Sequence, residues 1–123
     1  MSAGTIDALF EAMPERLDVR AARGLDAVIQ FEITGPDAGV YVVSVRNGAA
    51  SVAKGAHRAP NVKLKMSADT YLDLVMGRIS GPQALFKRRL RVKGDINCAM
   101  RLHALFPPVN DKAEIDAYLR NRA

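Results

Sequence analysis

Apolar residues follow two different periods along this chain. From Ile6 to Met13 they recur every three or four positions, which predicts an amphipathic helix that Thr5 caps and Pro14 ends. From Ala27 to Thr34 they occupy every second position, which is the period of a half-buried strand. The chain is therefore expected to open with a helix and a strand, each of which needs an apolar partner.

Three further strands are predicted in the middle of the chain. The β-branched run Val40 to Arg46 is followed by Asn47-Gly48, and both turn residues accept the positive φ that a two-residue type I′ turn requires. Ala49 to Lys54 should therefore pair back antiparallel. From Val62 to Met66 apolar residues alternate with two lysines, which predicts a strand with one face in water.

The second half of the chain mixes helices with one strand, and capping residues mark the boundaries. The order of elements is that of an α+β domain with a five-stranded, mainly antiparallel sheet and helices packed on one face. The predicted elements are a helix from Ala68 to Met76 capped by Ser67, a short helical piece from Ser80, a fifth strand through Leu90 and Val92, a helix from Ile96 to Phe106 capped by Asp95, and a terminal helix through Ile115, Tyr118 and Leu119.

The last core helix carries more apolar surface than a sheet can cover. Its polar residues gather on one narrow side around Arg101, and the surplus face presents Cys98, Leu102 and Leu105. This face must meet another helix, a second subunit or a bound apolar molecule. The pattern permits a cavity and leaves helix packing open as the alternative.

Composition and charge narrow the class of protein. The chain has 123 residues, 49% of them hydrophobic, and a net charge of +5, which favours phosphate-bearing partners, either nucleic acid or an anionic membrane. The single Cys98 excludes an internal disulfide, and the first residues lack a secretory signal, so we expect a cytoplasmic protein. The apolar runs are too short to span a membrane.

Catalytic and metal-binding patterns have little support in the sequence. Cys98 and His103 lie five positions apart on one helix, about 140° around its axis, so they do not form a nucleophile and base pair. His57 has no second ligand at metal spacing, and Asp69 and Asp73 fit a solvated helix face. We therefore expect neither enzymatic activity nor a bound metal. An esterase or thioesterase that uses Cys98 as its nucleophile is the minor alternative.

A basic run precedes and enters the fifth strand. Strand alternation sends Arg89, Arg91 and Lys93 to one side, which fits either a charge-protected edge strand or a contact with anionic phosphates. Nucleic acid is not expected, because no aromatic residues are interleaved with the run. The candidate contacts with a headgroup or membrane are Arg88, Arg89, Arg91 and Lys93.

Several segments between Ile6 and Phe106 form a pattern through their order and spacing. They are Gly24 to Phe31, Val45 to Gly48, Lys65 to Tyr71 leading to Gly77, and Leu90 to Asp95 followed by an apolar helix. Together they resemble the sterol carrier protein type-2 family. The second strand lacks the tryptophan often found there, and Lys87-Arg88-Arg89 stands where members often carry a glycine, so the family's sterol preference does not transfer.

The resemblance implies a domain at 1–108, with 109–123 as its helical extension, that holds a fatty acid, acyl-CoA, phospholipid or sterol-like molecule in an apolar tunnel. It implies no cofactor. We expect a monomer or weak homodimer that transfers or sequesters a long-chain lipid; the alternative is a non-catalytic module that dimerises through the same apolar helix faces. The candidate lining residues are Leu9, Met13, Ile29, Phe31, Met66, Leu72, Met76, Leu85, Phe86, Met100, Leu102 and Leu105.

Overall fold

The computed structural model describes residues 3–35 and 38–107, and these form one sheet with four helices. The second strand begins at Gly39 and the last helix ends at Leu105, each within one residue of the predicted boundary. The elements are α1 (Ala3–Arg16), β1 (Ala27–Thr34), β2 (Gly39–Arg46), β3 (Ala49–Lys54), β4 (Val62–Ser67), α2 (Ala68–Val75), α3 (Gly81–Phe86), β5 (Leu90–Gly94) and α4 (Ile96–Leu105).

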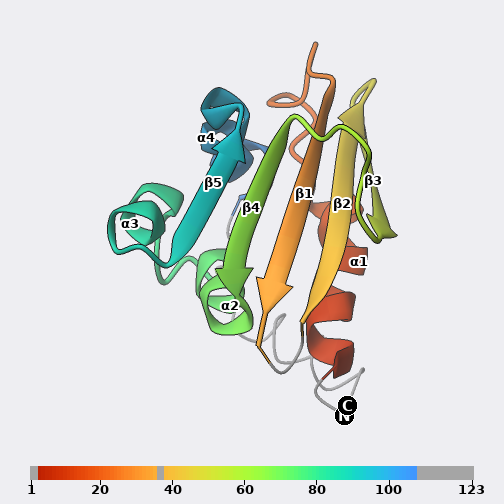
Figure 1. Cartoon of the computed structure of the whole chain (residues 1–123). Coiled ribbons are helices and arrows are strands. Elements are labelled where there is room, and N and C mark those ends of the chain that lie inside the picture. The colour runs from red at the N-terminus through yellow and green to blue at the C-terminus, as the bar shows by residue number, and fades with distance from the viewer. Residues whose placement is uncertain (1–2, 36–37, 108–123) are drawn as a thin grey trace.

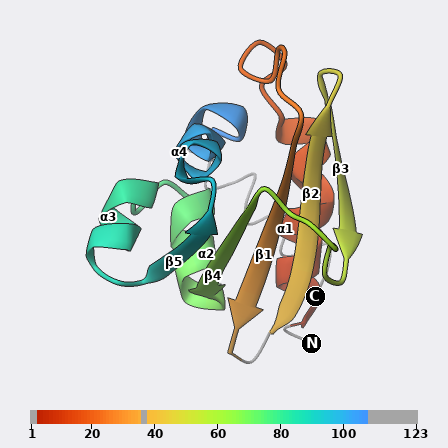
Figure 2. The same ribbon diagram turned by 45° about the horizontal axis from the view of Figure 1, so that its top comes forward.

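The five strands lie in the order β3-β2-β1-β4-β5. Three of the four pairings are antiparallel, and the central pair of β1 with β4 is parallel. Helices α1, α2 and α4 lie behind the sheet in Figure 1, while α3 sits beside the edge strand β5, an arrangement that Figure 2 shows from above. The predicted α+β class, with a mainly antiparallel sheet and helices on one face, is confirmed.

The turn between β2 and β3 has the predicted left-handed backbone. Asn47 and Gly48 have φ angles of 54° and 74°, and the two strands pair from Arg46 with Ala49 onward. A two-residue turn of this kind matches the right-handed twist of the flanking strands. The hairpin is therefore confirmed in both its position and its register.

Asn61 joins three strands at one end of the sheet. Its side-chain Oδ1 accepts a hydrogen bond of 2.7 Å from the backbone N–H of Val28, and its carbonyl accepts one of 2.8 Å from the N–H of Asp95. Gly94 has a φ of 115°, and a Cβ added there would lie 2.6 Å from the Asn61 carbonyl oxygen. Only glycine lets β5 approach this closely.

Side-chain caps begin α2, α3 and α4 as predicted. Ser67 accepts from the N–H of Thr70, and Asp95 accepts from two N–H groups of α4. Ser80 and Gln83 form a reciprocal capping box on α3. These caps satisfy backbone donors that would otherwise lack partners at the start of each helix.

The first helix differs from the prediction at both ends. It begins at Ala3, before Thr5, and runs to Arg16 with Pro14 inside its last turn. Proline removes one hydrogen bond but keeps a helical φ, so a final turn can continue past it. The predicted terminal helix and the extension at 109–123 lie outside the described residues.

Aromatic stacking fills the space between α1 and the sheet. The Phe10 ring lies between Tyr41 and Tyr71, with centroid distances of 4.0 and 4.4 Å and interplanar angles of 8° and 7°. Phe31 meets the edge of Phe10 at 5.2 Å. Asp7 accepts from the Tyr41 hydroxyl and pairs with Lys54 at 3.0 Å, so polar contacts also tie α1 to β2 and β3.

Candidate functional site

A cavity of about 280 Å³ lies between the β4–β5 side of the sheet and the helices α2, α3 and α4. Its surface is mostly aliphatic. The lining residues are Met13, Arg16, Phe31, Leu64, Met66, Tyr71, Leu74, Val75, Gly77, Ile79, Ser80, Gly81, Pro82, Gln83, Leu85, Leu90, Val92, Ile96, Ala99, Met100, Leu102 and Phe106.

The floor of the cavity is built by strand register. Phe31 of β1 lies opposite Leu64 of β4, which lies opposite Val92 of β5. The next inward row carries Met66 opposite Leu90. Because side chains alternate across a strand, these residues share the face that the helices cover, and they form a continuous apolar floor.

Exposed apolar side chains form one rim of the cavity. Leu85 on α3 and Ile96 and Met100 on α4 all line it, and they are 38%, 51% and 60% exposed. Tyr71, Val75 and Leu90, which line it elsewhere, are buried. The space between α3 and α4 is therefore the mouth of the cavity.

Arg16 is the one charged side chain among the described lining residues. Its Nη2 donates a hydrogen bond of 3.2 Å to the carbonyl of Pro107, where the end of α1 meets the end of α4. The Tyr71 hydroxyl contacts the sulfur of Met13 at 3.5 Å. Ser80 and Gln83 are occupied by the capping box of α3. Polar groups are thus few and concentrated away from the floor.

Tyr71 on the cavity wall and the nearby Cys98 are held in their neutral forms. Burial raises the pKa of Tyr71, and the nearby positive charge of Arg16 opposes this only in part. Burial, with a smaller contribution from the Asp95 carboxylate, raises the pKa of the Cys98 thiol. Cys98 is buried and does not line the cavity. A thiol in this setting is a poor nucleophile.

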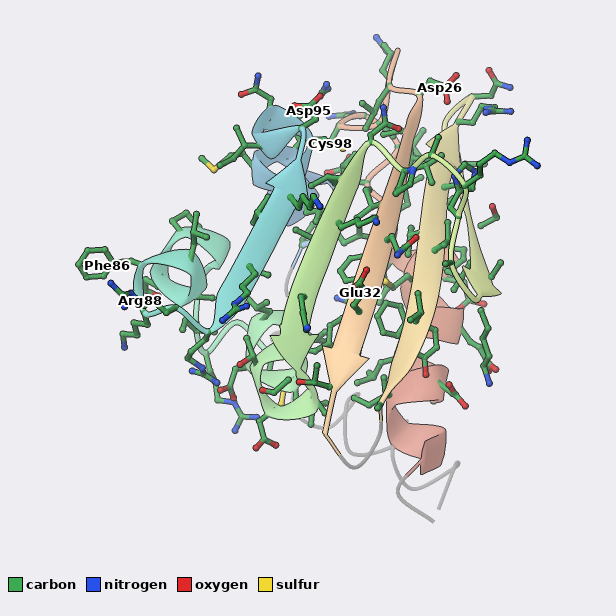
Figure 3. The ribbon with its side chains drawn as sticks, viewed as in Figure 1. Asp26, Glu32, Phe86, Arg88, Asp95 and Cys98 are labelled. Carbon is green, nitrogen blue, oxygen red and sulfur yellow. The ribbon has the colours of Figure 1, made fainter. Side chains whose placement is uncertain are left out.

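Six of the twelve residues predicted to line a lipid site lie on the cavity wall: Met13, Phe31, Met66, Leu85, Met100 and Leu102. Leu9, Ile29 and Leu105 instead belong to the fully buried core, and Leu72 and Met76 pack against that core. Phe86 is 88% exposed and points away from the sheet in Figure 3. Contact of any of these residues with a ligand stays a prediction.

The strand residues Leu64, Leu90 and Val92 line the cavity although they were absent from the predicted set. Their alternation with lysine and arginine was the available signal, because it already placed them on the inward face. Arg16 could not be found in this way. It follows the predicted end of its helix, and only the fold brings it to the cavity.

The basic run divides into two environments. Arg89 forms an ion pair of 2.7 Å with Asp73 and a hydrogen bond of 3.1 Å to the Thr70 hydroxyl, so it does not join the solvent face that strand alternation predicted. Asp73 is correspondingly engaged rather than solvated. Arg88, Arg91 and Lys93 are exposed. The reason is that β5 begins only at Leu90, after Arg88 has turned the chain with a φ of 61°.

Within residues 3–35 and 38–107, no three histidine, cysteine or acidic side chains lie close enough to hold a metal ion. None of the helices in the same ranges combines the length and the apolar composition needed to cross a bilayer.

Comparison with known proteins supports one family. Hydroxysteroid dehydrogenase-like protein 2 of Mus musculus is 26% identical over 111 residues, which are 89% of this chain and 22% of that protein. The chain thus spans about a fifth of this curated relative's length.

Solved structures agree in fold. The sec-alkylsulfatase Pisa1 of a Pseudomonas species superposes with a TM-score of 0.74 at 18% identity, over 83% of this chain and 16% of that one. Palmitated SCP2L2 of Aedes aegypti superposes with a TM-score of 0.67 at 20% identity, over 81% and 89%. The sequence signature of the SCP-2 sterol transfer family matches residues 6–107, and the chain belongs to that family.

Proposed function

We propose that this protein binds one single-chain lipid in the cavity and carries or sequesters it. The observation that carries the proposal is a cavity lined by aliphatic side chains, open between α3 and α4, with one charged residue among its described lining. Family membership supports the same reading.

The size of the cavity favours a single acyl chain. Its volume of about 280 Å³ lies just below the range of roughly 300 to 1,000 Å³ that small-molecule sites span. Burial of each methylene stabilises a complex by about 0.8 kcal/mol, so a chain burying a dozen gains about 10 kcal/mol before association costs. Hydrophobic burial is the main source of affinity in this proposal.

The polar end of the ligand is proposed to lie near Arg16. A carboxylate there gains a charge-assisted hydrogen bond, which is stronger than a bond between neutral groups. The floor offers such a group no polar partner, because it is formed by residues such as Leu64 and Val92. A free fatty acid therefore fits better than a sterol, and the palmitate carried by the mosquito relative makes palmitate the natural probe.

We propose no catalytic role. The burial of Cys98 outside the cavity, together with the raised pKa of its thiol, supports this proposal, because Cys98 is the one nucleophile that the sequence suggested. A carrier needs neither a nucleophile nor a cofactor, because its ligand leaves chemically unchanged.

Native mass spectrometry with added palmitate tests the proposal. We expect a one-to-one complex for the wild-type protein. Ala99→Phe places a ring in the cavity, whereas Ala104→Phe places the same ring on the exposed side of the same helix. We expect palmitate affinity to fall by at least about tenfold in Ala99→Phe, because the ring takes the space of several methylenes, and to be unchanged in Ala104→Phe.

The two variants also define the outcomes that contradict the proposal. Equal loss of palmitate in both would place binding outside the cavity. A wild-type protein that shows no mass shift with palmitate, a long-chain acyl-CoA or a lysophospholipid would exclude a single-chain carrier. Thermal unfolding of each variant checks that the fold is retained.

A further inference from the structure

We propose that the mouth of the cavity is a docking face for an anionic bilayer, so that lipid passes directly between the membrane and the cavity. This inference rests on the proposed carrier function and names the surface on which the carrier exchanges its ligand. Two features of the described residues carry it: an apolar rim and a set of cations.

The docking face carries the apolar rim, which is Leu85 on α3 with Ile96 and Met100 on α4, and also Phe86, the neighbour of Leu85 that lies outside the cavity. These are four of the five large apolar side chains that the described residues expose, and the fifth, Val19, lies in the loop after α1. Phe86 is 88% exposed and projects from the side of α3 that faces away from the sheet (Figure 3). Such a cluster marks an interaction site, because isolated apolar side chains would be scattered over the surface.

A cationic ladder lies on the outer face of β4 and β5, opposite the cavity, and β5 is in contact with both α3 and α4, which carry the rim. It consists of Lys63, Lys65, Arg91 and Lys93. Register places Lys63 directly opposite Lys93 and Lys65 directly opposite Arg91. Like charges in facing positions destabilise a sheet. None of the four forms an ion pair within the described ranges, and Glu32, opposite Lys65, is the one carboxylate among the neighbouring β1 positions of the ladder.

Two cations also follow Phe86 directly. Lys87 and Arg88 lie at the end of α3, and both are exposed, as Arg88 is in Figure 3. Arg89 does not contribute, because Asp73 holds it at 2.7 Å. An aromatic ring beside basic side chains is typical of interfacial membrane segments, in which the ring enters the headgroup region and the cations meet lipid phosphates.

Charge decides between a bilayer and a second copy as the occupant. In a symmetric dimer each patch meets the same patch of its partner, so Lys87 and Arg88 would face identical cations. A chain of net charge +5 gains nothing from that contact. An anionic lipid surface complements both the rim and the ladder, because it offers phosphates to the cations and acyl chains to the ring.

Flotation of the protein with phosphatidylcholine vesicles, with and without phosphatidylglycerol, tests the docking face. We expect binding to the anionic vesicles that weakens as salt is added. Phe86→Ser should reduce the bound fraction by about tenfold, since it removes a large apolar side chain from the interface. Val19→Ser, which removes an exposed apolar side chain in the α1–β1 loop, should bind as the wild type does.

A second pair of variants separates the ladder from net charge. Lys63→Gln with Lys93→Gln, and Arg20→Gln with Arg23→Gln in the α1–β1 loop, each remove two exposed or half-exposed cations. The ladder pair should lose roughly fivefold in vesicle binding for each cation removed. Equal losses in the two pairs would mean that net charge alone drives binding, and the ladder would have no special role.

Palmitate binding in vesicle-free solution distinguishes the failure of this inference from the failure of the carrier function. All four variants should bind palmitate as the wild type does. A wild-type protein that binds palmitate but no vesicle would overturn the docking face and leave the carrier intact. Sedimentation showing a dimer that Phe86→Ser dissociates would assign the rim to a second copy, and would also overturn it.

Discussion

The two halves of the sheet's inner face are filled in opposite ways. Under β1, β2 and β3, α1 packs a stack of aromatic rings with centroids 4.0 and 4.4 Å apart. Under β4 and β5, the helices α2, α3 and α4 leave a cavity of about 280 Å³ lined mostly by aliphatic side chains and methionine. We call these the packed half and the hollow half.

A small domain with a cavity must both fold stably and keep an internal space open. The two halves of the sheet meet these two requirements separately. Flat rings in contact on both faces cannot rearrange without losing contacts, so the packed half specifies the fold. Methionine and leucine side chains adapt to their neighbours at low energetic cost, which suits a cavity wall that must fit ligands of different shapes. We infer that stability is concentrated in the packed half, where no void is needed.

The largest expected effect comes from breaking the packed half. Phe10→Ala should lower the free energy of unfolding by about 3 to 5 kcal/mol, because it removes a fully buried ring that stacks on two others. Leu102→Ala on the cavity wall should cost about 2 kcal/mol or less, since the side chain is half-buried and its removal only widens an existing space. Urea denaturation measures both. Equal losses would contradict the proposed division of stability.

A smaller effect on the free energy of unfolding is expected at Gly94, where the end of β5 packs against Asn61. Gly94→Ala and Gly55→Ala both impose a positive φ on alanine, at 115° and 102°, but only the Gly94 Cβ meets backbone, 2.6 Å from the Asn61 carbonyl oxygen. We expect Gly94→Ala to cost at least about 1 kcal/mol more than Gly55→Ala in urea denaturation, as overpacking does elsewhere. The same loss in both variants would mean that β5 shifts freely.

The smallest expected effect concerns Tyr71, which belongs to both halves. Its raised pKa means that the unfolded chain releases the phenolic proton at a lower pH than the folded protein does. Stability should therefore fall above about pH 10, by up to about 1.4 kcal/mol per pH unit from this group. Tyr71→Phe should lack this component when urea unfolding is compared at pH 9 and 11. Identical pH profiles would show that water reaches the hydroxyl.

The sequence predicted which face each strand buries but not what lies over it. Ile29 and Phe31 alternate on the same face of β1, yet Ile29 is sealed in the core and only Phe31 reaches the cavity. Alternation defines a face, whereas the helix above each position is set by the tertiary arrangement.

The helix α3 shows a second limit. Leu85 and Phe86 both read as buried apolar positions, but Phe86 is among the most exposed side chains described. A helix of six residues at the edge of a sheet has too little partner surface to cover both. The prediction that Arg89 faces solvent was wrong for a similar reason. Its ion pair with Asp73 depends on α2 lying beside the start of β5, which is a tertiary contact.

The parallel pairing of β1 with β4 also sets an order of assembly. The hairpins that join β1, β2 and β3 close over short distances along the chain, whereas Ile29 finds Val62 only across the intervening two strands. Local contacts form before distant ones, because closing a long loop costs more entropy. The floor of the cavity is therefore expected to be among the last parts to form. A chain that is still folding would then have no site for a ligand until β4 has paired with β1.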